Sequence, residues 1–222
     1  MSKRAYGQFC GISRALELIG ERWTLLIVRD LLVGPRRYTD LRIGLPGIPT
    51  NVLSDRLKDL ERNDLVRRSL QARPGGAVVY ELTDYGRQLE PAVLQLGKWG
   101  AGALTDPGPD EVVTPDSLVM ALRTTFEPAA AAGVHAVLEL RFGEVVVHAR
   151  IDDGRLEVHP GGPDTPDLVI EAGPVLRAVM AGEVAADDAV AGGDVTLTGD
   201  ETLFARFAEL FPIKPRPPVA AA

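Results

Sequence analysis

The chain has 222 residues, which is enough for two domains of ordinary size or for one large domain. Its charge is uneven: residues 1–105 contain 16 Lys and Arg against 11 Asp and Glu, a net of +5, whereas the remainder contains 8 against 20, a net of −12. This asymmetry predicts an anionic partner for the first half only, and the overall net charge of −7 does not exclude DNA binding.

The start of the chain and its hydropathy predict a cytoplasmic protein with no membrane partner. Apolar residues near the N-terminus are interrupted by Ser13, Arg14 and Glu17, so no signal-peptide core forms. No apolar run approaches the roughly 20 residues that a bilayer span needs. A single cysteine, Cys10, excludes an internal disulfide and agrees with a reducing compartment.

Apolar residues at helical spacing predict three helices before residue 44. The first covers residues 11–19, the second covers residues 23–31 and is apolar nearly all round, and the third covers residues 38–43. Gly44-Leu45-Pro46-Gly47 is a breaker cluster that separates the third helix from a fourth. Two helices joined by a short glycine-containing turn are typical of a helix-turn-helix, whose second helix enters the major groove.

The fourth helix, residues 50–63, organises the N-terminal half. Leu53, Leu57 and Leu60 form one apolar stripe, and the opposite face is polar. We expect Thr50 to cap its start and Asn63 to tolerate a left-handed conformation at its end. Its polar side chains suit base edges and phosphates, although an ordinary solvated face would have the same composition. The candidates for the major groove are Thr50, Asn51, Ser54, Asp55 and Lys58, and those for phosphate contacts are Arg36, Arg37 and Arg56.

A β-hairpin and a further helix are expected next. Residues 65–72 and 77–82 are predicted strands around the turn Arg73-Pro74-Gly75-Gly76, which makes a wing with Arg73 as its main basic residue. Thr83-Asp84 caps the following helix, and Pro91 is expected to kink it. Its apolar side has more surface than the domain needs and should contact a second copy of the chain; it carries Tyr85, Leu89, Val93, Leu96 and Trp99.

Several motifs in this half closely resemble those of the HxlR-type winged-helix regulators. They are Cys10 before an apolar helix, Gly20-Glu21-Arg22-Trp23-Thr24-Leu25-Leu26-Ile27, Gly34-Pro35-Arg36-Arg37-Tyr38, Leu53-Ser54-Asp55-Arg56-Leu57-Lys58-Asp59-Leu60 and Tyr80-Glu81-Leu82-Thr83-Asp84-Tyr85-Gly86. The resemblance covers residues 8–104 and implies a dimeric bacterial transcription factor whose first and last helices form the dimer interface. The family often has Arg and Glu where this chain has Ala77-Val78-Val79, so wing contact with the minor groove depends mainly on Arg73.

The second half predicts an α+β domain with an antiparallel sheet covered by helices. It follows a Pro- and Gly-rich linker, and Thr114 caps a helix that begins at Pro115 and runs to residue 126. Asp153-Gly154 is a strong hairpin turn. Strands are expected at residues 135–142, 144–151, 155–159, 167–172 and 194–198, and further helices at residues 174–181 and 201–211.

The order of the later elements resembles the sterol-carrier-protein-like fold. The features that match are the strand Leu168-Val169-Ile170-Glu171-Ala172, the helix at residues 175–180, the segment from Gly193 to Asp200 and an apolar helix that ends at Leu210-Phe211. The resemblance covers residues 115–212 and implies a cavity between sheet and helices for an apolar ligand, without implying sterol.

No motif predicts an enzyme, a cofactor or a metal site. The sequence has no Gly-rich phosphate loop, nucleophile elbow or paired-His metal signature. The three histidines, His135, His148 and His159, lie on predicted strands and are interpreted as packed or solvated. Two acidic pairs, Asp152-Asp153 and Asp187-Asp188, are interpreted as solvated turns.

Cys10 is a candidate redox residue. It precedes the first helix and is near Lys3, Arg4 and Arg14 in sequence, so a helix N-terminus and cations would lower its pKa. The family resemblance agrees, since some members sense oxidants or electrophiles through a cysteine at about this place. Against this interpretation, a single cysteine is often a small buried hydrophobe.

Taken together, these features predict two domains. A winged helix-turn-helix domain for DNA binding and dimerisation covers residues 1–105, a linker covers 106–114, a sterol-carrier-like ligand-binding domain covers 115–212 and a disordered tail covers 213–222. The predicted function is a transcriptional regulator that binds a palindromic operator as a homodimer and is modulated by an apolar small molecule. Two alternatives stay open: a regulator switched by Cys10 oxidation with a structural C-terminal domain, and a lipid carrier or scaffold whose winged helix binds protein.

Overall fold

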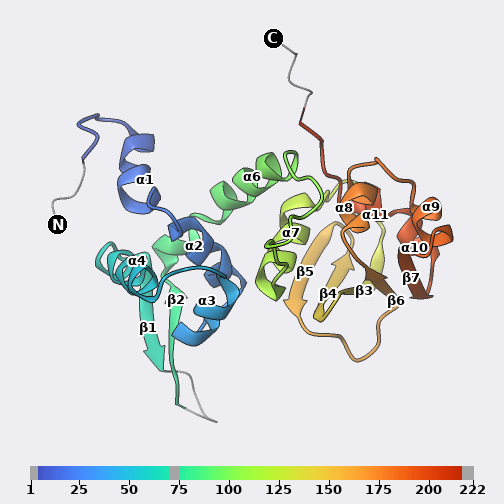
Figure 1. Cartoon of the computed structure of the whole chain (residues 1–222), viewed down its shortest axis with the longest axis horizontal. Helices are drawn as coiled ribbons and strands as arrows, with labels where there is room; N and C mark the ends of the chain where they lie inside the picture. The colour runs from blue at the N-terminus through green and yellow to red at the C-terminus, as the bar shows by residue number, and fades with distance from the viewer. Residues whose placement is uncertain (1–4, 71–75, 217–222) are drawn as a thin grey trace. The chain divides into compact units, whose positions relative to one another are not determined.

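The computed structural model describes residues 5–70 and 76–216, which form two compact units, Met1–Val93 and Leu94–Ala222 (Figure 1). The first unit is a winged helix-turn-helix, as the sequence predicts. Its elements in chain order are α1 (Gly11–Ile19), α2 (Thr24–Val33), α3 (Tyr38–Gly44), α4 (Thr50–Arg62), β1 (Val66–Leu70), β2 (Val78–Leu82) and α5 (Asp84–Arg87).

Helices α2 and α4 supply much of the core of the first unit. Leu53, Leu57 and Leu60 of α4 are buried, which confirms the predicted apolar stripe. Ile27 and Val28 of α2 are also fully buried, because this helix is apolar around most of its circumference. The buried stripe fixes which face of α4 remains in solvent.

Both predicted ends of α4 need correction. Thr50 is the first helical residue and does not cap it, since Pro49 occupies the N-cap position and no side chain caps the helix there. Asn63 has an ordinary negative φ of −95°, and the left-handed residue is Asp64, with a φ of 56°. The Asn63 side chain instead donates from Nδ2 to the Asp59 carbonyl at 2.7 Å, and the same carbonyl accepts the Asn63 backbone amide at 3.1 Å.

The wing is an antiparallel hairpin in which Val66 pairs with Leu82 and Leu70 pairs with Val78. Residues 71–75, and therefore Arg73, lie outside the described residues. An isolated antiparallel bridge between Arg36 and Tyr80 joins the α2–α3 connection to β2. The hairpin is thereby anchored at the middle of β2.

The helix expected after Thr83 is two helices. Thr83 caps α5 by accepting a hydrogen bond from the Gly86 amide at 3.0 Å, as predicted. The chain leaves the helical state at Gln88 and Leu89 and begins again as α6 (Glu90–Ala101). The interruption precedes Pro91 because proline has no amide hydrogen to donate to the carbonyl four residues earlier, and it is accepted in the first turn of a helix.

The second unit has an α+β fold in which five strands form one sheet of order β5-β4-β3-β6-β7. The elements that follow α6 are α7 (Pro115–Thr125), β3 (His135–Phe142), β4 (Val145–Asp152), β5 (Arg155–Pro160), β6 (Leu168–Ala172), α8 (Val175–Met180), α9 (Ala186–Ala191), β7 (Val195–Gly199), α10 (Thr202–Ala205) and α11 (Phe207–Leu210). Thr114 caps α7 in a reciprocal capping box with Ser117, which confirms the predicted start.

The prediction of a wholly antiparallel sheet is wrong at one pair, because β6 runs parallel to β3. The hairpins β3–β4 and β4–β5 leave β5 at one edge, and the chain then returns to pair β6 with β3. Residues 161–167 make this return across the face of the sheet that carries Glu139. A Cβ on Gly162 would lie 2.7 Å from the Glu139 carboxylate, and Glu139 is only 6% exposed.

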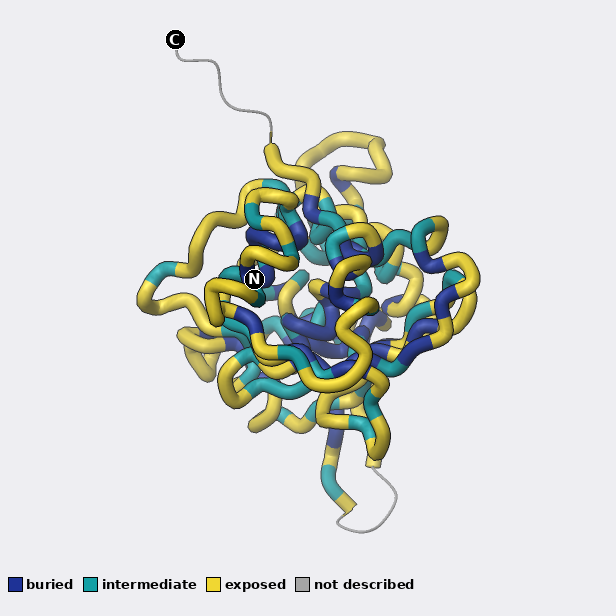
Figure 2. Tube along the Cα trace, turned by 90° about the vertical axis from the view of Figure 1, so that its right-hand side faces the viewer, coloured by how far each residue is buried: buried dark blue, intermediate teal, exposed yellow. Residues whose placement is uncertain are grey.

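Aromatic rings fill the other, helix-covered face of this sheet. Phe204, Phe207 and Phe211 are almost completely buried, and the ring centroids of Phe207 and Phe211 are 4.9 Å apart. Figure 2 shows the buried stretches at the centre of the view and exposed loops around them. The centre of this unit is therefore occupied by the protein's own side chains.

Three further expectations for the second unit are corrected. Asp187 and Asp188 lie in the first turn of α9, not in a turn between elements. The closing helix is split into α10 and α11 at Arg206. Residues 213–216 belong to the packed fold, since Ile213 is buried and donates its amide to the Met180 carbonyl at 2.8 Å.

Among the described residues no helix has the length and apolar character needed to span a bilayer.

Candidate nucleic-acid interface

The solvent-facing side of α4 carries most of the residues that the sequence predicts for the major groove. Asn51, Asp55 and Lys58 are exposed because the leucine stripe is buried on the opposite side, and Thr50 is exposed as the first residue of the helix. Lys58 and Asn51 have polar groups free to face a nucleic acid, and Asp55 supplies a hydrogen-bond acceptor. Asn51, Asp55 and Lys58 lie on one helix face, and Thr50 lies at the N-terminal end of the helix.

Ser54, the fifth candidate, is half-buried and contacts a residue of α3. The Tyr38 hydroxyl donates to the Thr50 carbonyl at 2.9 Å and lies 3.2 Å from Ser54 Oγ. Tyr38 therefore ties α3 to the first turns of α4. Sequence reasoning assigned no role to Tyr38, because its partners are 12 and 16 residues away.

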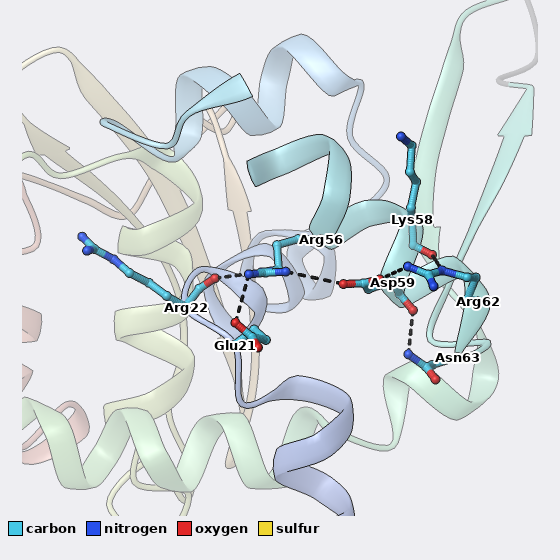
Figure 3. Close-up of polar contacts among 7 residues, drawn as sticks. All are labelled: Glu21, Arg22, Arg56, Lys58, Asp59, Arg62 and Asn63. Carbon is cyan, nitrogen blue, oxygen red and sulfur yellow. Dashed lines mark hydrogen bonds and ion pairs between the residues drawn. The ribbon is translucent and has the colours of Figure 1, made fainter. Parts of the chain in front are cut away.

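Arg56, a predicted phosphate contact, is engaged within the protein (Figure 3). Its guanidinium donates to the Arg22 carbonyl, the Glu21 carboxylate and the Asp59 carboxylate. Asp59 also forms an ion pair with Arg62, whose Nε donates to the Lys58 carbonyl at 3.4 Å. The Lys58 ammonium points away from this network in Figure 3.

The other predicted phosphate contacts differ in their surroundings. Arg37 is exposed at the start of α3, where its backbone amide donates to the Asp40 carboxylate at 2.9 Å. Arg36 is half-buried, and its Nη1 donates to the Pro35 carbonyl at 3.0 Å. Arg42, on α3, is a further exposed cation that the sequence did not single out. Arg37 and Arg42 make no ion pair with any residue that the structure describes.

Two cations of the first wing strand are paired with carboxylates. Arg68 donates to Glu61 through two nitrogens at 2.6 and 3.0 Å, and these hydrogen bonds raise the pKa of Arg68 above its ordinary value. Arg67 donates to Glu81 at 3.0 Å across the hairpin. The wing's basic residues are therefore partly neutralised in the described part of the hairpin.

Two cavities of moderate size lie among the described residues of the second unit. One, of about 380 Å³, is lined by Arg141, Glu171 and Asp194 among others. The other, of about 350 Å³, is lined by His135, Arg150, Asp152 and Asp167 among others. Both have charged walls, whereas the sequence led us to expect an apolar cavity between sheet and helices.

The histidines of this unit are solvated or paired. His135 Nδ1 lies 2.6 Å from Asp152 Oδ1, and the rings of His148 and His159 have centroids 5.5 Å apart. No group of three or more potential ligands is placed to hold a metal ion among residues 5–70 and 76–216.

Cys10 has an exposed thiol at the N-cap position of α1. Hydrogen bonding to the backbone amides of Ser13 and then Ile12 lowers the pKa of Cys10 below its ordinary value. Arg14, which was expected to contribute, is paired with Glu17 at 2.6 Å. Lys3 and Arg4 lie outside the described residues. The amides at the helix start are therefore the main cause of the lowered pKa.

Comparison with known proteins places the first unit in a family. A model described as HxlR-like helix-turn-helix matches residues 18–106. The transcriptional regulator YvaP of Bacillus subtilis is 36% identical over 86 residues, which is 39% of this chain and 80% of that protein. An uncharacterised helix-turn-helix regulator of Mycobacterium tuberculosis is 43% identical over 107 residues, which is 48% of this chain and 66% of that protein. The solved structure of the redox regulator HypR in its reduced form is 32% identical to this chain. The match covers 41% of this chain and 90% of the HypR chain, with a TM-score of 0.38.

Proposed function

The chain belongs to the HxlR-like helix-turn-helix family of bacterial transcriptional regulators, and from that premise we propose that it binds a palindromic operator as a homodimer. The observation that carries this proposal is the exposed polar face of α4, opposite a fully buried leucine stripe. In this proposal α4 enters the major groove, Asn51 contacts a base edge and Arg37 contacts a phosphate.

Salt dependence tests DNA binding against the rival in which the winged helix binds protein. A duplex selected by the wild-type protein from a random pool serves as the operator. Binding through about six phosphates should weaken by roughly 10³ or more between 50 and 200 mM salt. Failure to select any duplex, or an affinity that does not change with salt concentration, would contradict the proposal.

Two substitutions separate base reading from backbone holding. Asn51→Ala should cost about 1–3 kcal/mol and relax the preference at one operator position. Arg37→Ala should weaken all duplexes alike and lower the salt slope by about one unit. If Asn51→Ala weakened all duplexes alike, Asn51 would not read a base.

In the proposed regulator, an apolar small molecule bound by the second unit changes operator affinity. The support is a sheet covered on one face by helices, in a unit joined to the DNA-binding unit. Phe207 and Phe211 fill the space between these layers, so a ligand must displace their rings. Saturating palmitate should change operator affinity by about 5- to 150-fold, the usual range for coupled sites. Equal affinities with and without palmitate would count against palmitate as the regulator's ligand.

A second candidate function is supported by the exposed Cys10 thiol at a helix start. In this alternative the thiolate attacks hydrogen peroxide and forms an S–O bond as the O–O bond breaks, which gives sulfenic acid and hydroxide, and the hydroxide takes a proton from solvent to become water. Cys10 is the only cysteine in the chain, so every thiol-dependent response must come from it. Peroxide should change operator affinity of the wild type and leave Cys10→Ser unchanged. The same response in both proteins would contradict the alternative.

A further inference from the structure

All three nitrogens of the Arg56 guanidinium already donate to acceptors within the first unit (Figure 3). Nε donates to the Arg22 carbonyl at 3.2 Å, Nη2 to Glu21 at 3.0 Å and Nη1 to Asp59 at 3.4 Å. A planar guanidinium presents its donors in a fixed fork, so these contacts define its orientation. Three of its five N–H groups are thus engaged, and a phosphate contact by the other two would have to fit this fixed orientation.

Two of the three acceptors belong to the turn between α1 and α2. Glu21 and Arg22 immediately precede Trp23, which has a φ of 77° although it is not glycine. A bulky residue in this left-handed region persists only where its surroundings hold it. The Arg22 side chain lies over the Trp23 ring, 5.2 Å from the centroid, and the Arg22 carbonyl accepts the Arg56 hydrogen bond. Arg56 thus joins α4 to a strained turn.

Burial separates Arg56 from the cations that can face DNA. Its side chain is 20% exposed, whereas Lys58, two residues further along α4, is exposed. We propose that Arg56 is a positioning residue, which holds the DNA-reading helix α4 on the α1–α2 turn and makes no phosphate contact. This inference rests on the proposed function, because α4 is taken to be the helix that reads DNA.

The salt slope distinguishes the two roles of Arg56. If Arg56 positions α4, Arg56→Ala should leave the slope of affinity against salt unchanged, while the Arg37→Ala control lowers it by about one unit. Arg56→Ala should also lower the preference for the selected duplex over a scrambled one by about fivefold or more, since the base contacts of α4 shift. A slope lowered by about one unit would overturn the inference.

Arg56→Lys adds a test that preserves charge and most of the packed stem. A lysine binds phosphate as a point charge but cannot reach three separate acceptors. We therefore expect Arg56→Lys to lose duplex preference much as Arg56→Ala does. Full retention of preference in Arg56→Lys would overturn the inference.

The two roles of Arg56 predict opposite effects of Glu21→Gln on operator binding. Glu21 is largely exposed, so this variant should fold, which circular dichroism checks. If Arg56 bound phosphate, removal of the Glu21 charge would free it and strengthen operator binding. A positioning role predicts that Glu21→Gln weakens the preference for the selected duplex and adds no further loss to Arg56→Ala. Stronger operator binding by Glu21→Gln, or additive losses in the double variant, would overturn the inference.

The proposed function and this inference fail in different ways. If the wild type selects no duplex, the proposed function fails at the first step. If the wild type binds and Arg56→Ala changes the salt slope, only the role of Arg56 fails. Trp23 fluorescence without DNA, measured in a Trp99→Phe background, supplies a readout that is independent of binding. Arg56→Ala should shift this emission, and an unchanged spectrum would overturn the link to the turn.

Discussion

At the scale of single residues, the hydroxyl of Tyr38 on α3 forms contacts that position α4. It donates to the Thr50 carbonyl at 2.9 Å and lies 3.2 Å from Ser54 Oγ. Tyr38→Phe removes these contacts and keeps the ring, so it should lower the free energy of unfolding by about 0.5–1.5 kcal/mol. Urea unfolding measures the change. Tyr85→Phe is the matched control, because its hydroxyl has no hydrogen-bond partner among the described residues, and equal effects of both variants would contradict the assignment.

The Arg67–Glu81 pair predicts a pH-dependent contribution to the stability of the wing. The hydrogen bond from Arg67, and a smaller one from Ser69, lower the pKa of Glu81 from its ordinary value of 4.5. A carboxylate with a lowered folded pKa stabilises the fold above pH 4.5, and this contribution is lost as the pH falls through the folded pKa. Glu81→Gln should therefore be less stable than the wild type at pH 7. The difference should shrink below pH 4.5 in urea unfolding, and a difference that ignored pH would contradict the pairing.

At the residue scale, the sequence predicted which face of α4 is exposed but not which side chains are already engaged. Periodicity alone separates Leu53 and Leu57 from Asn51 and Lys58. It places Arg56 beside the apolar stripe, three residues after Leu53, yet two of the acceptors of Arg56 lie 34 and 35 residues earlier in the chain. Pairings across such distances depend on tertiary packing and leave no local pattern.

Helix α6 carries two glycines whose surroundings predict different effects of the same substitution. A Cβ on Gly97 would lie 3.0 Å from the Thr124 side chain of α7, whereas a Cβ on Gly100 would meet no atom within 4 Å. Alanine favours a helix over glycine by up to about 1 kcal/mol, less near a helix end. Gly100→Ala should therefore raise the melting temperature. Gly97→Ala should raise the melting temperature by less, or lower it.

Thr124→Ala supplies the control for this comparison, because it removes the atoms that a Gly97 Cβ would approach. In the Thr124→Ala background, Gly97→Ala and Gly100→Ala should have similar effects on thermal unfolding. If Gly97→Ala remained the less stable variant there, contact with Thr124 would not explain the difference.

At the element scale, patterns that span a whole strand or helix were predictable and pairings between elements were not. The range of β3 and the Asp153-Gly154 turn follow from alternation and turn chemistry. The parallel pairing of β6 with β3 does not, because alternation specifies a face and not a neighbour. Helix α9 was missed since it has six residues and only Ala189 is buried, which is too little for a helical period.

At the scale of the whole molecule, the change in charge along the chain indicated two parts, but it did not indicate at which residue the first compact unit ends. The division at Val93 and Leu94 assigns most of α6 to the second unit. Lys98 of α6 lies 3.6 Å from Glu127, and the Arg216 amide donates to the Gly102 carbonyl at 2.7 Å. These contacts join segments that are about 30 and 114 residues apart, so composition alone could not reveal them.

The exposed apolar side of α1 predicts that the regulator is a dimer in which α1 contacts a second copy. Ile12 is 70% exposed, and Phe9 and Leu16 are also exposed on this segment. Burial of such a patch is favourable at roughly 25 cal/mol per Å² of apolar surface. Ile12→Glu should therefore shift the protein from dimer to monomer in sedimentation measurements. Ile43→Glu is the matched control, because Ile43 is 74% exposed on α3, and it should leave the dimer intact.

The same two-fold arrangement determines how the protein protects DNA. A dimer that places one α4 in each of two successive major grooves should protect two segments about one helical turn, roughly 34 Å, apart. Hydroxyl-radical footprinting on the selected duplex measures this spacing, and Ile12→Glu should lose the paired pattern at a concentration where the wild type is dimeric. Because two half-sites act together only when they are linked, the variant should also bind the duplex more weakly. A wild-type monomer that protects a single segment would contradict both the dimer and the palindromic operator.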